Sequence, residues 1–399
     1  MQRIRVEQRR RFLARRQLLG GVEPPADVES LTRSLVCLHG TDPASVYLSA
    51  RARLPGFGVA DLDRALYQDR SLIKQLAMRR TLFVIDKDDL GDVQPAGAAR
   101  VAGSESRKMI KMVEASGIAT DGARWLDRAR KAVLAALADD REVTSTELNA
   151  ELPILQGTVR AGSGKWTADV PIAPRILTIL SAEGRVVRAT NRGPWYASRP
   201  RWSTMEAWLG ESWRPADPDT AHRRMVQRWL RAFGPGTADD LKWWLGSTVA
   251  AVKRSLAELD LVEVELDGRT GYLLADDLDA LLDDHDVEPW VALLPALDPT
   301  PMGWVDRDWY LGEHKPLVYD NTGNAGPTIW CDGRIVGGWW QDPEGAVVVQ
   351  LLEDIGRQAA AAVDAQAAEL STWLAGKVVL PRFPSPLAKA VRDQRPSHT

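Results

Sequence analysis

Apolar residues at helical spacing alternate with breaks that contain proline and glycine over the first 120 residues. The apolar side of a first long helix carries Ile4, Phe12, Leu18 and Leu19. A second helix is predicted over 28–38 and a third over 44–53, because His-Gly-Thr-Asp-Pro at 39–43 and Leu-Pro-Gly at 54–56 interrupt the pattern. Residues 72–85 predict a helix end that runs into a strand.

Beyond residue 120 the pattern repeats. Thr144-x-x-Glu147 and Thr237-x-x-Asp240 each place a hydroxyl three residues ahead of an acid, which predicts the capped start of a helix. Further on, a helix leads into two strands joined by a glycine-containing turn, and the matching positions lie 76 residues apart: Leu180, Val186 and Tyr196 against Leu256, Val262 and Tyr272. Three helices followed by a two-stranded wing are the winged-helix order.

The earlier copy is longer by 17 residues, which fall around 157–171. This insertion includes Lys165 and Trp166 in a glycine-rich stretch, and a mobile loop with one cation and one aromatic ring suits a nucleic-acid groove. The alternative is a surface insertion without function. The sequence leaves both interpretations open.

The last quarter of the chain changes to short β-type runs. These lie at 291–295, 309–311, 328–331, 334–340 and 346–351, and Asp332-Gly333 is a hairpin signal between two of them. An Ala-rich helix follows at 353–375, and an acidic stretch at 276–288 predicts a solvated helix and linker before the strands.

The expected fold is therefore a multidomain α+β protein. Three tandem winged-helix (helix-turn-helix) units are predicted over 1–120, 121–210 and 211–287, the first of them the most divergent. A C-terminal domain over 288–399 is predicted to form a small antiparallel sheet or a β-barrel-like structure.

Charge is distributed unevenly along the chain. The net charge is −3, but residues 1–201 carry a net +10 and the remainder a net −13. Seven arginines lie between Arg3 and Arg16. A basic half that faces a polyanion and a solvated acidic half would explain this split, and chance combined with arginine-rich codon usage would explain it equally well.

Other classes of protein find little support. No apolar run reaches the length of a membrane span, and no signal core follows the basic N-terminus, so a cytoplasmic protein is expected. Cys37 and Cys331 are far apart, and the histidines form no metal-ligand motif. We therefore expect no metal and no cofactor.

Several segments resemble the AlkZ/YcaQ-type family of winged-helix DNA glycosylases, and their order and spacing cover nearly the whole chain. They are Leu38 to Pro43, Arg51 to Phe57, Met78 to Phe83, Arg192 to Trp195, Trp208 to Gly210, Leu294 to Pro299 and Asp332 to Gly337. The resemblance implies tandem winged helices with a C-terminal β-barrel. It also implies double-stranded DNA as the partner and release of purines alkylated at ring nitrogens, including bulky adducts and crosslinks, for repair or for resistance to a genotoxin.

The chain departs from this family at the catalytic motif. Active members carry Gln-x-Gln, or Gln with an acid, just before Asp-Pro, whereas this chain has His39-Gly40-Thr41 before Asp42. Glutamine orients water and offers a carbonyl dipole to a sugar cation. Thr41 can hold water but gives the sugar cation less stabilisation. Neutral His39 could accept a proton from water, whereas protonated His39 would oppose a cationic transition state. Asp42 is the nearest carboxylate and a candidate base, although Pro43 behind it also favours a helix-capping role.

Further candidates for DNA contact rest on position. Arg79 and Arg80 lie where a helix was expected to enter a strand, and Arg192 belongs to a family-like segment. Trp304 and Arg307 fit an apolar wedge with an adjacent cation for the minor groove. Against this, Trp309 and Tyr310 of the same segment could belong to the core of the barrel domain.

Two functions remain open from the sequence. The first is a monomeric DNA glycosylase, because three units in one chain grip DNA without dimerisation. The second is a non-catalytic damage sensor or regulator on the same scaffold. A small-molecule enzyme lacks support, because no Walker motif, dinucleotide glycine pattern or serine nucleophile elbow is present.

Overall fold

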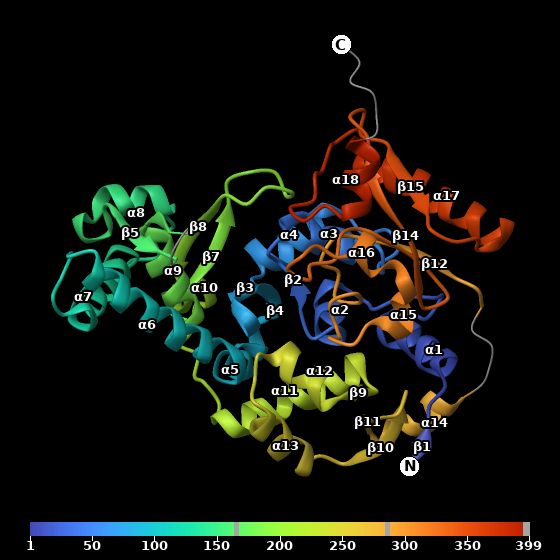
Figure 1. The fold of residues 1–399 in the computed structure, drawn as a ribbon. Coiled ribbons are helices and arrows are strands. Elements are labelled where there is room, and N and C mark those ends of the chain that lie inside the picture. The colour runs from blue at the N-terminus through green and yellow to red at the C-terminus, as the bar shows by residue number, and fades with distance from the viewer. Residues whose placement is uncertain (163–166, 284–287, 394–399) are drawn as a thin grey trace. The chain divides into compact units, whose positions relative to one another are not determined.

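The protein is described by a computed structural model over residues 1–162, 167–283 and 288–393. Helices and strands are mixed along the chain, so the expected α+β class is confirmed (Figure 1). The chain divides into two compact units. Unit 1 comprises Met1–Leu62 with Val226–Thr399, and unit 2 comprises Asp63–Met225.

Unit 1 combines the two ends of the chain. Its N-terminal elements are β1 (Gln2–Arg3), α1 (Val6–Arg16), α2 (Val28–Ser34), β2 (Leu38–His39), α3 (Pro43–Arg51) and α4 (Val59–Asp63, whose last residue belongs to unit 2). Its middle elements are β9 (Gly236–Thr237), α12 (Ala238–Leu245), α13 (Val249–Ala257), β10 (Leu261–Leu266), β11 (Arg269–Leu274) and α14 (Leu278–Leu282). Its last elements are β12 (Val291–Leu294), α15 (Asp308–Leu311), α16 (Lys315–Val318), β13 (Thr328–Cys331), β14 (Arg334–Gln341), β15 (Val347–Leu351), α17 (Gly356–Leu374) and α18 (Pro386–Asp393).

Unit 2 is the middle of the chain. Its elements are β3 (Leu72–Leu76), β4 (Leu82–Asp86), α5 (Leu90–Val93), α6 (Ala99–Ala115), α7 (Gly122–Ala136), α8 (Ser145–Glu151), β5 (Thr158–Ala161), β6 (Ala168–Pro171), α9 (Ile172–Ala182), β7 (Val186–Asn191), β8 (Pro200–Thr204) and α10 (Met205–Leu209). Helix α11 (Pro218–Phe233) continues from unit 2 into unit 1.

The helices and the last hairpin of unit 2 follow the predicted order. Thr144 begins α8 with a reciprocal capping box, in which its hydroxyl accepts from the Glu147 amide while the Glu147 carboxylate accepts from the Thr144 amide. Helices α7, α8 and α9 enclose a core that includes Trp125, Leu148 and Leu180. Strands β7 and β8 then form an antiparallel hairpin. The insertion around 157–171 was expected to be a loop, but β5 and β6 lie within it and pair as antiparallel strands.

The second copy of the repeat lies in unit 1. Thr237 caps α12 through the same reciprocal arrangement with Asp240. Strands β10 and β11 form an antiparallel hairpin, and β1 and β9 extend it to a four-stranded sheet. Ile4 and Phe12 from the start of the chain pack into the core beneath this sheet, so the N-terminal helix completes the repeat.

The C-terminal strands form an open sheet. Its order is β12-β13-β14-β15, all pairs are antiparallel, and Asp332-Gly333 makes the turn between β13 and β14. Among residues 288–393 this sheet does not close on itself, so the barrel expected for this domain is not confirmed. Residues 309–311 belong to helix α15 rather than to the predicted strand, because Trp309 and Tyr310 turn into a cluster of aromatic rings.

Two predictions in the first part of the chain were also wrong in detail. Residues 72–85 form an antiparallel β-hairpin, not a helix end, and most side chains on both faces of these strands are buried. The second helix ends at Ser34, four residues earlier than expected, because Val36 adopts a left-handed conformation with φ of 67°. The chain then enters β2, which carries His39.

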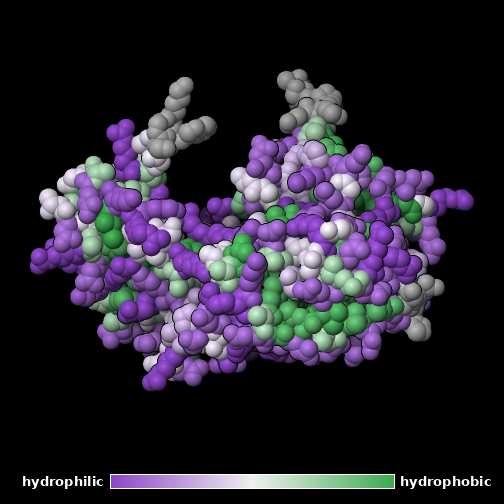
Figure 2. Space-filling view, turned by 60° about the horizontal axis from the view of Figure 1, so that its bottom comes forward, coloured by the Kyte–Doolittle hydropathy of each residue, from purple (hydrophilic) through white to green (hydrophobic). Residues whose placement is uncertain are grey.

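No helix within the described residues is long and apolar enough to cross a membrane. Hydrophilic residues cover most of the face drawn in Figure 2, with hydrophobic residues gathered in smaller areas. The large hydrophobic side chains that are exposed come from scattered positions: Met1, Ile118, Val249, Val305, Val378 and Leu380.

Candidate active site

The three residues predicted from the sequence as catalytic candidates, His39, Thr41 and Asp42, lie at the start of α3 in unit 1. His39 ends β2, Thr41 lies in the connection, and Asp42 is the N-cap of α3. His39 and Asp42 are buried, with 7% and 3% of their surface exposed, whereas Thr41 is half-buried. The local sequence accounts for this geometry, because Pro43 suits the first turn of a helix and Asp42 suits the position before it.

Asp42 accepts two hydrogen bonds from main-chain amides. Its Oδ1 accepts from the Ala44 amide at 3.3 Å and its Oδ2 from the Arg382 amide at 2.9 Å. Burial raises the pKa of the Asp42 carboxyl, although both amides and the charge of Arg382 act in the opposite direction. The carboxylate therefore joins the start of α3 to a segment 340 residues further along the chain.

Arg382 is a residue that the sequence analysis missed. It is exposed, its guanidinium lies 3.5 Å from the Thr41 carbonyl oxygen, and 5.9 Å separates it from the ring of Phe383. It follows α17 in a stretch without helical or β periodicity, so no signal in the sequence connects it to residues 39–42.

A buried polar network holds α3 against the segment that leads away from β12. The Arg53 guanidinium donates to both carboxylate oxygens of Asp298 at 2.8 Å, and both side chains are fully buried. Ser49 donates to the same carboxylate at 2.6 Å, and Ser45 donates to the Ala296 carbonyl oxygen at 2.5 Å. These contacts fix the helix that carries Asp42 against the segment around Asp298.

Arg79 and Arg80 lie in unit 2 at the turn between β3 and β4. Both adopt a left-handed conformation, with φ of 55° and 63°, which is unusual for arginine. The Arg80 side chain is half-exposed and lies 3.4 Å from Glu105, which Lys108 also contacts. This turn presents cations at the end of a rigid hairpin, as a phosphate contact would require, and such a role stays a prediction.

Arg192 begins the connection between β7 and β8 in unit 2, and its amide donates to the Arg199 carbonyl oxygen across the hairpin. The neighbouring Asn191 orders this connection, because its side-chain amide donates to the carbonyl oxygens of Gly193, Pro194 and Ala197. Arg192 is exposed and 3.7 Å from Glu147. The connection is thus pre-organised by its own hydrogen bonds. Lys165 and Trp166, the other candidates in this unit, lie outside the described residues.

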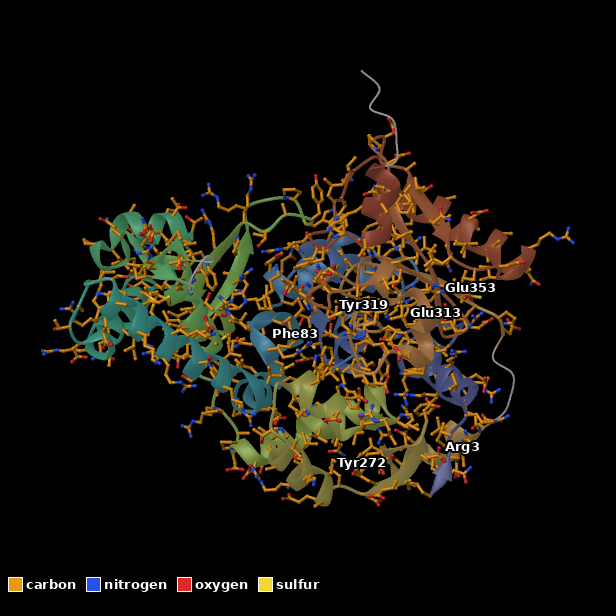
Figure 3. The ribbon with its side chains drawn as sticks, viewed as in Figure 1. Arg3, Phe83, Tyr272, Glu313, Tyr319 and Glu353 are labelled. Carbon is orange, nitrogen blue, oxygen red and sulfur yellow. The ribbon has the colours of Figure 1, made fainter. Side chains whose placement is uncertain are left out.

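Trp304 and Arg307 occupy the interior of unit 1. The Trp304 indole donates to the Phe233 carbonyl oxygen and packs edge-on against Phe233. Arg307 donates to the Trp304 carbonyl oxygen, and its guanidinium lies 4.1 Å from the ring of Tyr319, labelled in Figure 3. Only 2% of Trp304 and 6% of Arg307 are exposed, so a DNA contact through either would require unpacking of this cluster. Trp309 and Tyr310, for which the sequence suggested a place in the core, are also buried, with 5% and 1% of their surface exposed.

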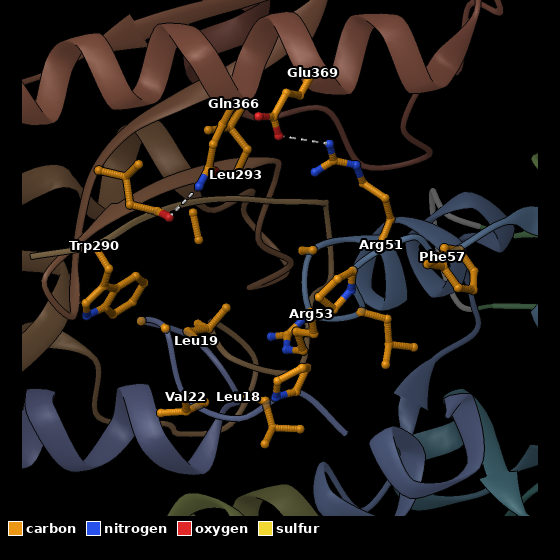
Figure 4. A pocket seen from close by; sticks show the side chains of 18 of the residues that line it. Leu18, Leu19, Val22, Arg51, Arg53, Phe57, Trp290, Leu293, Gln366 and Glu369 are labelled. Carbon is orange, nitrogen blue, oxygen red and sulfur yellow. Dashed lines mark hydrogen bonds and ion pairs between the residues drawn. The ribbon is translucent and has the colours of Figure 1, made fainter. Parts of the chain in front are cut away.

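Unit 1 also contains a cavity of about 630 Å³ beyond the C-terminal end of α3 (Figure 4). Arg51 and Glu369 form an ion pair at 3.7 Å on its wall, and Gln366 donates to the Val291 carbonyl oxygen. Arg51 is the last residue of α3, whereas Asp42 caps its first turn, and residues 39–42 do not line the cavity. The cavity is therefore separate from residues 39–42. The described residues contain no group of three or more potential metal ligands.

This chain is similar in sequence and in fold to known DNA glycosylases. The family model described as DNA glycosylase AlkZ-like matches residues 32–373. An interstrand DNA cross-link repair glycosylase from Streptomyces sahachiroi is 24% identical over 311 residues, which are 76% of this chain and 79% of that protein. The structure of Streptomyces sahachiroi DNA glycosylase AlkZ superposes with a TM-score of 0.74 at 21% identity, over 96% of this chain and 99% of that one.

The structural similarity shows that the two proteins share a fold, and the match to the family model assigns this chain to a family. It runs from α2, just before the segment that carries His39, to the last turn of α17. The chain therefore belongs to the AlkZ-like family of DNA glycosylases.

Proposed function

We propose that this protein is a DNA glycosylase that hydrolyses the N-glycosidic bond of purines alkylated at ring nitrogens, including bulky adducts or crosslinks. Family membership and the similarity to the interstrand DNA cross-link repair glycosylase of Streptomyces sahachiroi support the reaction class. The observation that carries the proposal is the position of His39, Thr41 and Asp42 together at the amino end of α3.

The chemistry makes modest demands on these side chains. Alkylation at a ring nitrogen puts positive charge on the base, which becomes a good leaving group as the bond to the sugar breaks. The sugar then develops oxocarbenium character, which dipoles and negative charge stabilise. The half-buried Thr41 hydroxyl holds water, and neutral His39 accepts a proton from it. Asp42 acts mainly as a fixed negative charge, because main-chain amides already engage both of its oxygens.

DNA binding would use the repeated helical units. The order α7, α8, α9 and the β7–β8 hairpin recurs as α11, α12, α13 and the β10–β11 hairpin, which supports two winged-helix units. A third unit before residue 121, and a monomer bound to double-stranded DNA, complete the proposal. Arg79, Arg80 and the wing residue Arg192 are the proposed phosphate contacts.

A second candidate function is a non-catalytic protein that senses damaged DNA. The specific observation in its favour is the replacement of the family's Gln-x-Gln by His39-Gly40-Thr41, which removes two carbonyl dipoles from the site. Buried His39, if protonated, would also oppose a cationic transition state.

Single-turnover release of the base separates the two functions. The substrate is a duplex with one bulky N7-alkylguanine, and spontaneous depurination of the same duplex is the baseline. We expect release well above baseline by the wild type. His39→Ala and Thr41→Ala should reduce it by about 10- to 1000-fold.

Matched controls lie elsewhere in unit 1. His314→Ala removes a histidine that contacts Glu353, and Thr372→Ala removes an exposed threonine of α17. Both variants should release base like the wild type. Wild-type release no faster than baseline, together with tighter binding to the damaged than to the undamaged duplex, would refute the glycosylase and support the sensor.

A further inference from the structure

Residues 377–385, which we call the C-terminal strap, run from the end of α17 to the start of α18 across unit 1. Gln341 of β14 holds the beginning of the strap, because its amide donates to the Lys377 carbonyl oxygen at 2.9 Å and its Oε1 accepts from the Val379 amide at 2.7 Å. The end of the strap packs so closely on Gly326 that a Cβ there would lie 2.5 Å from the Ser385 Cβ. Both ends of the strap are therefore fixed.

The middle of the strap is fixed to the proposed catalytic segment. The bond from the Arg382 amide to Asp42 uses the main chain, so the Arg382 side chain is not needed for the attachment. Asp42 is 3% exposed, which places this bond in a protected setting. The strap consequently holds the Arg382 Cα at a set position beside Thr41 and Asp42.

The Arg382 guanidinium is available to an external anion. It is exposed, and within the described ranges no carboxylate lies at ion-pair distance from it. Arg51, Arg231 and Arg334, other arginines of unit 1, each contact an acidic side chain. The strap also exposes an apolar side chain close by, since 71% of Leu380 is accessible. An exposed guanidinium held at a set position is a suitable donor to the oxygens of a phosphate.

We propose that Arg382 is a positioning residue that binds one DNA phosphate next to the target nucleotide and thereby aligns the glycosidic bond with His39 and Thr41. This inference rests on the proposed function, because it requires DNA at residues 39–42. Arginine suits the role, since its planar donors match phosphate oxygens.

The test neutralises one phosphate at a time. Duplexes with the lesion and a single methylphosphonate at successive positions are bound to wild type and Arg382→Ala. We expect one substitution beside the lesion to weaken wild-type binding about tenfold. Arg382→Ala should bind the duplex without a methylphosphonate about tenfold more weakly than the wild type does. A methylphosphonate at that one position should not weaken the binding of Arg382→Ala any further, whereas the variant should respond to the other positions like the wild type. Its slope of log affinity against log salt should fall by about 0.9.

The controls separate charge from folding. Arg357→Ala removes an exposed arginine of α17 and should leave affinity and salt slope unchanged, while Arg382→Lys should keep the slope. In single-turnover reactions Arg382→Ala should raise the half-saturating protein concentration and also lower the maximal rate, because the phosphate no longer aligns the glycosidic bond. Three outcomes would overturn the inference. Arg382→Ala could bind DNA as tightly as the wild type, or it could respond to the methylphosphonate at every position as the wild type does. The third outcome is that the wild type does not bind DNA. Binding of DNA does not depend on release of the base. If binding depends on Arg382 and on one phosphate but no base is released, only the proposed hydrolysis is refuted.

Discussion

Replacement of Asp298 by asparagine tests whether the buried network around Arg53 fixes the helix that carries Asp42. The Asp298 carboxylate accepts two hydrogen bonds from Arg53, one from Ser49 and one from the Thr300 amide at 3.0 Å. Asparagine offers one acceptor oxygen in place of two and turns an amide toward a guanidinium. The substitution leaves a fully buried cation without its counter-charge.

The expected loss is large. Removal of one partner from a buried ion pair costs about 3–5 kcal/mol in the free energy of unfolding. Burial by itself raises the pKa of Asp298, but the charge and hydrogen bonds of Arg53 outweigh it, so the folded pKa is lowered. The stabilising effect is therefore present above the unfolded pKa and is lost as pH falls through the folded pKa. Asp298→Asn should remove the part of the acid-induced decrease in the free energy of unfolding that is due to this carboxyl.

Urea unfolding followed by tryptophan fluorescence measures the effect. The control is Glu151→Gln, which disrupts an ion pair with Arg141 that is about half-exposed and should therefore change the free energy of unfolding little. In the double variant Arg53→Met with Asp298→Asn, the loss should be smaller than the sum of the single losses. A loss below about 1 kcal/mol for Asp298→Asn would refute the assignment of a structural role to this pair.

Two further predictions concern stability. Burial, reinforced by Arg188, lowers the pKa of Lys74 to about 8 from an ordinary 10.5. Between these values the unfolded chain binds a proton that the folded chain has lost, so the urea midpoint should rise with pH, and Lys74→Met should remove this rise. Gly20 has φ of 72°, and a Cβ there would lie 2.8 Å from the Trp290 ring. Gly20→Ala should lower the free energy of unfolding by about 1–3 kcal/mol. Gly21→Ala shares the φ of 72° but meets nothing within 4 Å, so an equal loss there would contradict the steric argument.

The sequence predicted those features that depend on neighbouring residues. The capping boxes at Thr144 and Thr237 and the turn at Asp332-Gly333 need only a few residues of the correct type, and all three are present. The same holds for Asp42, whose helix start was recognisable from Pro43. Local hydrogen bonds and dihedral preferences decide these features.

Only the tertiary structure decided which distant residues meet at the candidate site. Arg53 and Asp298 are 245 residues apart, and nothing in the residue pattern around them indicates that the two side chains are buried against each other. Arg382 comes to Thr41 because Gln341, Asp42 and Gly326 hold the strap, and no periodicity encodes such contacts. Trp304 and Arg307 show the reverse case, since residues suited to DNA were placed in the core by aromatic packing. Such long-range contacts depend on the packing of whole elements, whereas a residue pattern reports only the preferences of its own segment.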